Sequence, residues 1–366
     1  MKLSLIFIGS TGAGPAYSFE MARALALSRR CEMQIIVSSR ALNIKQWIDT
    51  FSEMPNVSLV CFDTFKKSSL HALLSMINFR KQNKLINLIK SYGPDVVYSP
   101  FVTIWGNYVF GRLSKFTRVI NTLHDPEPHY PPKNNAELII YIVNLANRFV
   151  NDIVLLNKKD KDKVEKKYGK KTIVIPHASL SYGDRKDIHL SGPLTRTIGF
   201  MGRIEPYKGV ELLVEAFEKC STAGLKLLIA GSGKIGDKLR TQILNNPNIE
   251  LINRYIRDEE IPEIIKKMDF MVLPYKNATQ SGVIPMSFSM GKPVIATNVG
   301  ALEEQVVEGT GWLVEVNAHS IKDKIEWLYC NPDAIFNAGK KAYKYSQDYL
   351  TWESSARLLL DYLEQG

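Results

Sequence analysis

Short apolar runs rich in β-branched residues recur along the first half of the chain, and each is separated from the next by a segment long enough for a helix. Such runs are typical of buried strands, and their alternation with helical segments predicts βα units on a parallel sheet. The expected strands of the first half are residues 3–8, 33–37, 57–61, 95–98, 118–122, 152–156 and 172–175.

The alternation stops at residue 179, where glycine, proline and charged residues gather, and it resumes at residue 197. We interpret residues 179–197 as a linker between two doubly wound α/β domains, residues 1–178 and residues 198–345. The amphipathic segment 352–363 predicts a helix that packs on a domain surface, so residues 346–366 form a C-terminal helix. The expected strands of the second half are residues 197–201, 225–230, 249–252, 270–273, 294–296 and 312–314.

Length and composition bear on the number of domains, the location of the protein and its metal binding. Its 366 residues exceed what one hydrophobic core usually supports, which agrees with two domains. The apolar run at residues 3–8 is too short for the core of a signal peptide, and no later run approaches the length that spans a bilayer. The cysteines at 31, 61, 220 and 330 show no spacing of a zinc site or disulfide framework, so we expect a cytoplasmic protein without a metal site.

The net charge of +10 favours an acidic partner such as nucleic acid, an anionic membrane or a phosphorylated ligand. No zinc-finger spacing or RNA-binding strand motif is present, so we do not expect nucleic acid. Segment 66–90 interleaves cations with apolar residues, which suits either peripheral contact with an anionic membrane or a helix that covers the N-terminal sheet. The cations of this segment are Lys66, Lys67, Arg80, Lys81, Lys84 and Lys90.

Two glycine-rich stretches follow expected strands. Gly12 and Gly14 lie in the first (GSTGAGP, 9–15), where they allow backbone amides to approach a ligand or simply form a tight turn. The second (GSGKIG, 231–236) matches the dinucleotide-binding pattern, but it follows the second strand of its domain instead of the first. We therefore expect no nucleotide cofactor.

Two cations on one turn suit a diphosphate. Arg203 and Lys208 lie in the turn 202–209 (GRIEPYKG) between a strand and a helix, and such a pair can neutralise a diphosphate without metal, although the same residues could be ordinary surface charges. Residues 280–283 precede Pro285 at the start of another helix, where free amides can hold an anion. His124 follows a strand at the edge where open α/β sheets bind ligands, but it could equally have a structural role.

In this order, these segments resemble the family 4 retaining glycosyltransferases, with the strongest likeness between residues 198 and 314. The resemblance implies the GT-B fold, in which two Rossmann-like domains face a cleft. The segments that carry it are GRIEPYKG (202–209), LLIAGSG (227–233), DFMVLP (269–274), GKPVIAT (291–297), VGALEE (299–304) and GTGWLV (309–314).

The resemblance also implies roles for individual residues. Arg203 and Lys208 would bind the donor diphosphate, while His124 would contact the donor sugar and Ile256 the nucleobase. The nucleotide-sugar site would further include Gly12, Gly14, Gly202, Gln280, Ser281, Gly282, Val283 and Glu304.

The family's paired glutamates, which have seven residues between them, are missing. Alignment on Pro285 places Gln280 and Phe288 at their positions, whereas alignment on Gly291 places Ala278 and Met286 there. Glu304 is the nearest remaining acid. The sequence therefore leaves the sugar and the affinity for the nucleotide open.

The implied activity is the transfer of a hexose-type sugar, with retention, from a nucleotide-diphosphate donor to a glycan or polyprenyl-diphosphate-linked acceptor. The setting would be bacterial cell-surface polysaccharide synthesis at the inner face of the plasma membrane. Two alternatives stay open: a sugar-nucleotide epimerase of the same fold, and a non-catalytic subunit that binds a sugar nucleotide.

Overall fold

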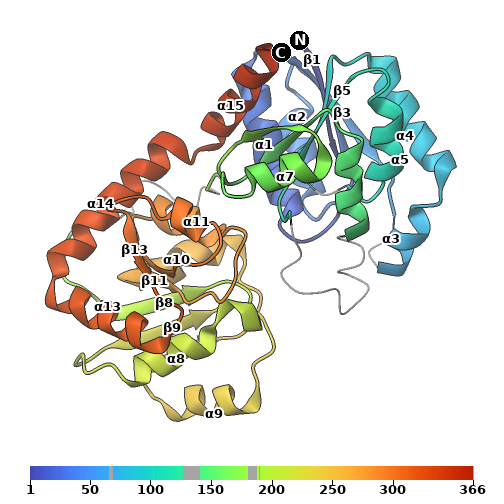
Figure 1. Ribbon diagram of the computed structural model, residues 1–366. Helices are drawn as coiled ribbons and strands as arrows, with labels where there is room; N and C mark the ends of the chain where they lie inside the picture. Colours follow the sequence, from blue (N-terminus) through green and yellow to red (C-terminus); the bar gives the residue numbers. More distant parts are fainter. Residues whose placement is uncertain (66–68, 102, 127–140, 180–187, 189, 366) are drawn as a thin grey trace. The chain divides into compact units, whose positions relative to one another are not determined.

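The computed structural model describes residues 1–65, 69–101, 103–126, 141–179, 188 and 190–365 (Figure 1). The chain forms two compact units, one made of Met1–Pro176 with Trp352–Gly366 and the other of His177–Thr351. The chain thus passes between the units twice, once at residue 177 and once at residue 352. We describe each unit by itself.

The N-terminal unit is built on a parallel sheet of seven strands in the order β3-β2-β1-β4-β5-β6-β7. Buried aliphatic residues from the strands and from the helices beside them form its core, as expected for a sheet covered on both faces. Its strands are β1 (Lys2–Phe7), β2 (Glu32–Ser38), β3 (Val57–Phe62), β4 (Val96–Ser99), β5 (Arg118–Leu123), β6 (Asp152–Leu155) and β7 (Lys171–Val174).

The connecting helices of this unit follow the glycine-rich turn and the later loops (Figure 1). Pro15 lies in the first turn of α1, where its missing amide costs no hydrogen bond. The helices are α1 (Gly14–Ser28), α2 (Ile44–Phe51), α3 (Ser69–Ser75), α4 (Phe79–Tyr92), α5 (Gly106–Leu113), the 3₁₀ turn η1 (Leu145–Arg148) and α7 (Lys161–Tyr168).

The C-terminal unit has a six-stranded parallel sheet in the order β10-β9-β8-β11-β12-β13. Its strands are β8 (Thr197–Met201), β9 (Lys226–Ala230), β10 (Ile249–Ile252), β11 (Phe270–Leu273), β12 (Val294–Thr297) and β13 (Gly311–Val314). Its helices are η3 (Pro206–Lys208), α8 (Val210–Glu218), α9 (Asp237–Asn245), η4 (Asp258–Glu260), α10 (Ile261–Lys266), α11 (Val283–Ser289), α12 (Leu302–Gln305), α13 (Ala318–Cys330) and α14 (Pro332–Tyr349).

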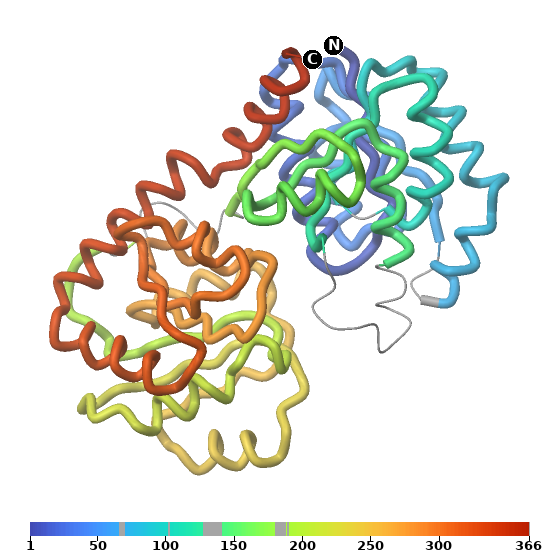
Figure 2. The backbone as a smooth tube through the Cα atoms, in the orientation of Figure 1, coloured from blue at the N-terminus to red at the C-terminus, as the bar shows by residue number. Residues whose placement is uncertain are grey.

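Each strand expected from the sequence is present, and no end differs by more than one residue. The expected C-terminal helix is α15 (Trp352–Glu364), and it packs beside α1 in the N-terminal unit (Figure 2). The ring of Trp352 lies 4.9 Å from that of Tyr17, and Arg30 pairs with Asp361 and Glu364. The expected boundary at residue 346 falls inside α14, because that helix continues to Tyr349 in the C-terminal unit.

The basic segment 66–90 forms two helices, α3 and α4, instead of one; Lys66 and Lys67 lie outside the described residues. The break is held by the Gln82 side-chain amide, which donates to the backbone oxygens of Ser75 and Met76. Leu85 and Ile89 of α4 are buried, so this helix covers the N-terminal sheet. Among the described helices, none combines the length and apolar character needed to cross a bilayer.

Candidate functional site

A cavity of about 320 Å³ lies at the carboxyl edge of the C-terminal sheet. Ligands of open α/β sheets bind at this edge, because the loops that leave the strands converge there. We call it the donor cavity. It is lined by Met201, Gly202, Arg203, Tyr207, Lys208, Ala230, Gly231, Ser232, Tyr255, Ile256, Ile261, Tyr275, Gln280, Ser281, Gly282, Val283 and Met286.

Glycines allow the loops after β8 and β9 to touch. Gly231 has φ +144°, and a Cβ there would lie 1.9 Å from the carbonyl oxygen of Gly202. A Cβ on Gly233 would lie 2.1 Å from the oxygen of Ile204, whereas one on Gly236 would meet nothing within 4 Å. In this structure, the first two glycines of the dinucleotide-like pattern thus serve the packing of one loop on the other.

The Lys208 ammonium lies inside the donor cavity. Its Nζ donates to the hydroxyl of Tyr275 at 3.2 Å and lies 3.1 Å from where a Cβ on Gly202 would be. Gly209, at φ +63°, lets η3 approach Pro274 so closely that a Cβ would lie 2.0 Å from the Pro274 oxygen. A bulkier residue at either glycine would therefore displace this lysine.

Arg203 lies at the exposed rim of the same cavity. Its side chain is 72% exposed, and its ion-pair contact with Glu205 is long, at 3.9 Å. A guanidinium in such a position can turn toward an anion without breaking a buried interaction. The two predicted phosphate-binding cations thus line one cavity, whose described lining contains no carboxylate.

The loop before α11 is held by a residue that sequence reasoning did not select. Gln305 of α12 accepts from the Ser281 amide at 2.7 Å and donates to the Ser281 oxygen at 3.0 Å. The Ser281 hydroxyl in turn accepts from the Val283 amide at 3.3 Å and lies 3.4 Å from the Tyr275 hydroxyl. Two of the amides expected to hold an anion, those of Ser281 and Val283, therefore already have acceptors inside the protein.

Gln280 brings an acceptor that has no partner among the described residues. Its Oε1 atom is buried without a hydrogen bond, although the residue lines the donor cavity. A buried polar atom without a partner costs on the order of 1–3 kcal/mol, so such atoms are often satisfied by a ligand or water. A ligand hydroxyl in this cavity would provide the missing donor.

The two candidate positions for the second missing glutamate lie in different surroundings, and each alignment places one of its two positions in the lining of the donor cavity. Met286 lines the donor cavity, whereas Phe288 is fully buried in the core of the unit. The position that faces the cavity thus carries a thioether instead of a carboxylate. Glu304 does not line the cavity, although its neighbour Gln305 fixes the loop beside it.

Two further residues near the cavity were not selected as site residues. Tyr255 lies next to the predicted base contact Ile256 and is 72% exposed. The available signal was an aromatic residue in the loop that follows the expected strand 249–252. The His177 ring lies 3.5 Å from the position of a Cβ on Gly282. Burial lowers the pKa of His177, against the opposing effect of its hydrogen bond with the Ala178 oxygen. The imidazole is therefore neutral at pH 7.

The candidate residues of the N-terminal unit gather around Phe101. His124 is 6% exposed; its Nε2 lies 3.0 Å from the Pro100 oxygen, and its ring lies 4.2 Å from that of Phe101. A Cβ on Gly14 would lie 2.8 Å from the Phe101 ring, whereas Gly12, at φ +77°, has open space around it. His124 and Gly14 are thus brought together within their unit.

No group of three His, Cys, Asp or Glu side chains among the described residues is arranged to hold a metal ion.

A family model described as "Glycosyl transferases group 1" matches residues 195–331, which include the whole lining of the donor cavity. An uncharacterized glycosyltransferase of Methanocaldococcus jannaschii is 25% identical over 317 residues, which cover 83% of this chain and 84% of that protein.

A capsular polysaccharide biosynthesis glycosyltransferase, CapM of Staphylococcus aureus, is 28% identical over 182 residues, 46% of this chain and 47% of that protein. Among solved structures, Anabaena HepE in complex with UDP and glucose aligns over the full length of both chains with a TM-score of 0.71 and 18% identity. With two Rossmann-like units of the same architecture, the chain is a glycosyltransferase that carries a group 1 domain on a GT-B fold.

Proposed function

We propose that the protein is a retaining glycosyltransferase of family 4 that transfers a hexose-type sugar from a nucleoside diphosphate donor. The observation that carries this proposal is the charge of the donor cavity, whose described lining holds Arg203 and Lys208 but no acid. A diphosphate needs such an environment, and HepE, which has the same fold, was crystallised with UDP and glucose.

The chemistry we propose depends on the leaving group. The acceptor hydroxyl attacks the anomeric carbon on the face from which the diphosphate departs, and the departing phosphate oxygen takes the proton. Negative charge then develops on the diphosphate, where the ammonium of Lys208 and the guanidinium of Arg203 stabilise it without metal. No protein base is required, and His124 has the separate role of contacting the donor sugar.

The neutral side chains of the cavity determine how the rest of the donor is held. The orphan Oε1 of Gln280 accepts a hydrogen bond from a sugar hydroxyl, and the nucleobase lies against Ile256 and Tyr255. At the candidate for the second glutamate that faces the cavity, Met286 offers no acceptor comparable to a carboxylate. We therefore expect the ribose to contribute less to affinity than the diphosphate.

The acceptor we propose is a glycan or polyprenyl-diphosphate-linked glycan of bacterial cell-surface polysaccharide synthesis. The similarity to CapM, whose name assigns it to capsular polysaccharide biosynthesis, supports this setting. For such an acceptor, we propose that the enzyme is cytoplasmic and works at the inner face of the plasma membrane.

The corner between α3 and α4 supports peripheral membrane contact. The side chains of Leu70, Leu74, Ile77 and Phe79 are between 49% and 69% exposed there, although the inner face of α3 is anchored by the bond from Trp105 to Ser75. Residues 64–94 contain six Lys and Arg and no Asp or Glu. Apolar tips flanked by cations suit an anionic bilayer.

Vesicle sedimentation tests this contact. The protein should bind vesicles of anionic phospholipid more strongly than vesicles of neutral phosphatidylcholine, and Leu74→Asp/Ile77→Asp should abolish the difference. The matched control is Leu244→Asp, at a leucine of the C-terminal unit that is 70% exposed. Equal binding of the corner variant and the control would refute the membrane contact.

Calorimetry with UDP, GDP, ADP and CMP tests the donor site. One nucleoside diphosphate should bind without added metal, and Lys208→Met should weaken it roughly 10- to 100-fold, because a hydrogen bond to a charged group contributes about 1.5–3 kcal/mol. Lys219→Met, at an exposed lysine paired with Glu215 on α8, is the control. Absence of binding by all four nucleotides, or equal binding by both variants, would contradict the proposal.

The absence of the paired glutamates keeps one other candidate, a non-catalytic subunit that binds a sugar nucleotide. The cavity-facing Met286 favours it, because a carboxylate contact with the ribose is missing. Such a subunit would bind the nucleotide but release no free nucleoside diphosphate from the donor when extracts containing lipid-linked acceptors are added. An epimerase would instead change the sugar of the donor without any acceptor.

A further inference from the structure

A second cavity lies at the other edge of the C-terminal sheet. It has a volume of about 210 Å³ and lies beside the amino ends of β11 and β12, whereas the donor cavity lies at the carboxyl edge. The two cavities share no described residue. Its walls come from residues 190–195, which lead into β8, from the turn 291–293, and from α14.

Two glycines close the walls of this second cavity tightly. A Cβ on Gly291 would lie 2.5 Å from the Leu190 side chain, and one on Gly339 of α14 would lie 2.5 Å from the Gly291 oxygen. The turn is also tied to α11, because the Lys292 amide donates to the Ser287 oxygen at 2.9 Å and the Ser287 hydroxyl donates to the Lys292 oxygen at 2.8 Å. The backbone that carries Lys292 is therefore fixed.

The side chain of Lys292 is the unusual feature of the second cavity. It is half-buried, and its ammonium makes no hydrogen bond or ion pair with any residue that the structure describes. Burial lowers the pKa of Lys292, with Asp269 acting in the opposite direction. A half-buried ammonium without a partner is unfavourable, and an anion would relieve this cost.

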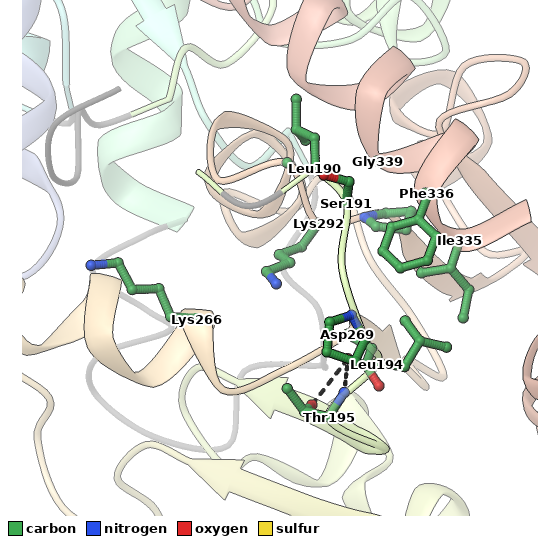
Figure 3. Close-up of a pocket in the computed structure, with 13 residues that line it drawn as sticks. Leu190, Ser191, Leu194, Thr195, Lys266, Asp269, Lys292, Ile335, Phe336 and Gly339 are labelled. Carbon is green, nitrogen blue, oxygen red and sulfur yellow. Dashed lines mark hydrogen bonds between the residues drawn. The ribbon is translucent and has the colours of Figure 1, made fainter. Parts of the chain in front are cut away.

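Asp269 does not fill that role, because its oxygens are already bonded elsewhere. One oxygen accepts from the Thr195 amide at 2.8 Å and the Thr195 hydroxyl at 3.0 Å, and the other accepts from the Tyr329 hydroxyl at 3.0 Å. Figure 3 shows these bonds to Thr195, with the Lys292 side chain separate from them. Lys266, at the rim, pairs with Glu263.

One wall of the second cavity is apolar, whereas Ser191, Thr195 and Asp269 belong to the polar part of its lining. Leu194 lies on the side of the incoming chain, and Ile335 and Phe336 project from α14 beside it (Figure 3). Lys266 and Asp269 already have partners, so an apolar wall and the ammonium of Lys292 are left to orient a small ligand, and a volume of about 210 Å³ suits a ligand of the size of one ring with an anionic group. We propose that this cavity binds a small organic anion, with its carboxylate or phosphate on Lys292 and its apolar part against Phe336.

The site is suited to an effector, not a substrate. Residues 190–195 belong to the segment through which the chain enters the C-terminal unit, and α14 leads to the point where the chain leaves it at Trp352. A ligand there touches both connections and stays away from the donor cavity. Its binding energy is therefore available to favour one arrangement of these connections over another.

Binding of benzoate, phenyl phosphate and neutral benzyl alcohol to the full-length protein tests the proposal, measured by ligand-observed NMR. Benzoate or phenyl phosphate should bind, and benzyl alcohol should bind at least ten-fold more weakly; the preferred anion identifies the head group. Lys292→Met should weaken anion binding at least ten-fold, whereas Lys340→Met, at an exposed lysine of α14, should not. Phe336→Ala keeps the cation and should weaken benzoate more than acetate.

The proposal fails if neither anion binds at 10 mM, if benzyl alcohol binds as well as benzoate, or if Lys292→Met and Lys340→Met bind anions equally. It also fails if UDP, GDP or ADP competes with the bound anion, since that result would place the anion in the donor cavity. Nucleotide binding without anions is measured separately, so failure of the donor site and failure of this site are distinguishable.

Discussion

At the scale of single residues, the donor cavity depends on positions that carry no chemistry of their own. Gly202, Gly209 and Gly231 have positive φ angles, and a Cβ on any of them would crowd Lys208, Pro274 or a neighbouring loop. The cations are thus placed by backbone that only glycine can form without strain. The loops after β8 and β9 therefore form a rigid pair.

Gly231→Ala tests this rigidity. The added methyl would lie 1.9 Å from the Gly202 oxygen at a φ angle of +144°, so we expect a loss of roughly 2–4 kcal/mol in unfolding free energy. Gly236→Ala, where a Cβ meets nothing within 4 Å, should be nearly neutral. Urea unfolding of both variants decides the point, and equal stability would show that the loops adapt easily.

The partly buried His177 predicts a dependence of stability on pH. Its pKa is lower in the folded chain than in the unfolded chain, where it is about 6.5, so the unfolded state binds the proton more readily. Stability should therefore fall as the pH drops below about 6.5 and should not respond to this group at higher pH. In denaturant unfolding at pH 7.5 and 5.5, His177→Gln should reduce the loss, whereas His319→Gln, at an exposed histidine, should not.

At the scale of elements, the short helix α12 contributes the buried Leu302 to the core, and through Gln305 it also fixes the loop that leads into α11. Such a bidentate contact holds both the backbone N–H and the backbone C=O of one residue, Ser281. Loss of the side chain leaves two polar groups of Ser281 to find other partners. The loop is therefore held by a neighbouring element, not by its own sequence.

Gln305→Ala should accordingly weaken nucleoside diphosphate binding, by roughly ten-fold, with little change in the melting temperature of the C-terminal unit. Gln242→Ala on α9 is the control, because that side chain makes one long contact with Glu218 on the protein surface. Calorimetric titration measures the effect. Unchanged affinity in Gln305→Ala would mean that the loop is held by Tyr275 and α11 alone.

At the scale of the whole molecule, the N-terminal unit is built from two separate parts of the sequence, residues 1–176 and residues 352–366. α15 packs beside α1, with Leu359 and Leu360 fully buried, so the N-terminal unit is not finished until the last residues are folded. This arrangement makes two passages of the chain between units unavoidable. It also places the stability of one unit under the control of residues distant in sequence.

Leu360→Ala should therefore destabilise the N-terminal unit by about 2–5 kcal/mol, since it removes a fully buried side chain. Leu358→Ala, at a neighbouring leucine that is 38% exposed, should cost far less. Hydrogen exchange followed by mass spectrometry should show faster exchange in residues 1–176 and little change in residues 177–351. Faster exchange in both units would contradict separate cores.

The sequence by itself determined the strands, the fold class and the glycosyltransferase family. Strands of parallel sheets are buried on both faces, so each appears as a continuous apolar run, and the ordered motifs between residues 198 and 314 are distinctive. Arg203 and Lys208 could be proposed because charges on a turn after a strand lie at the ligand-binding edge. These inferences use only local sequence.

Only the tertiary structure decided which distant residues meet. Gln305 contacts Ser281, which lies 24 positions earlier in the sequence. Met286 lines the donor cavity, whereas Phe288 is buried in the core. Lys292 faces a second cavity that two distant segments form. The split of the basic segment into α3 and α4 likewise depends on Gln82 and its contacts with the turn. Such contacts follow from how the loops and helices pack, and the periodicity of apolar residues along the chain does not predict them.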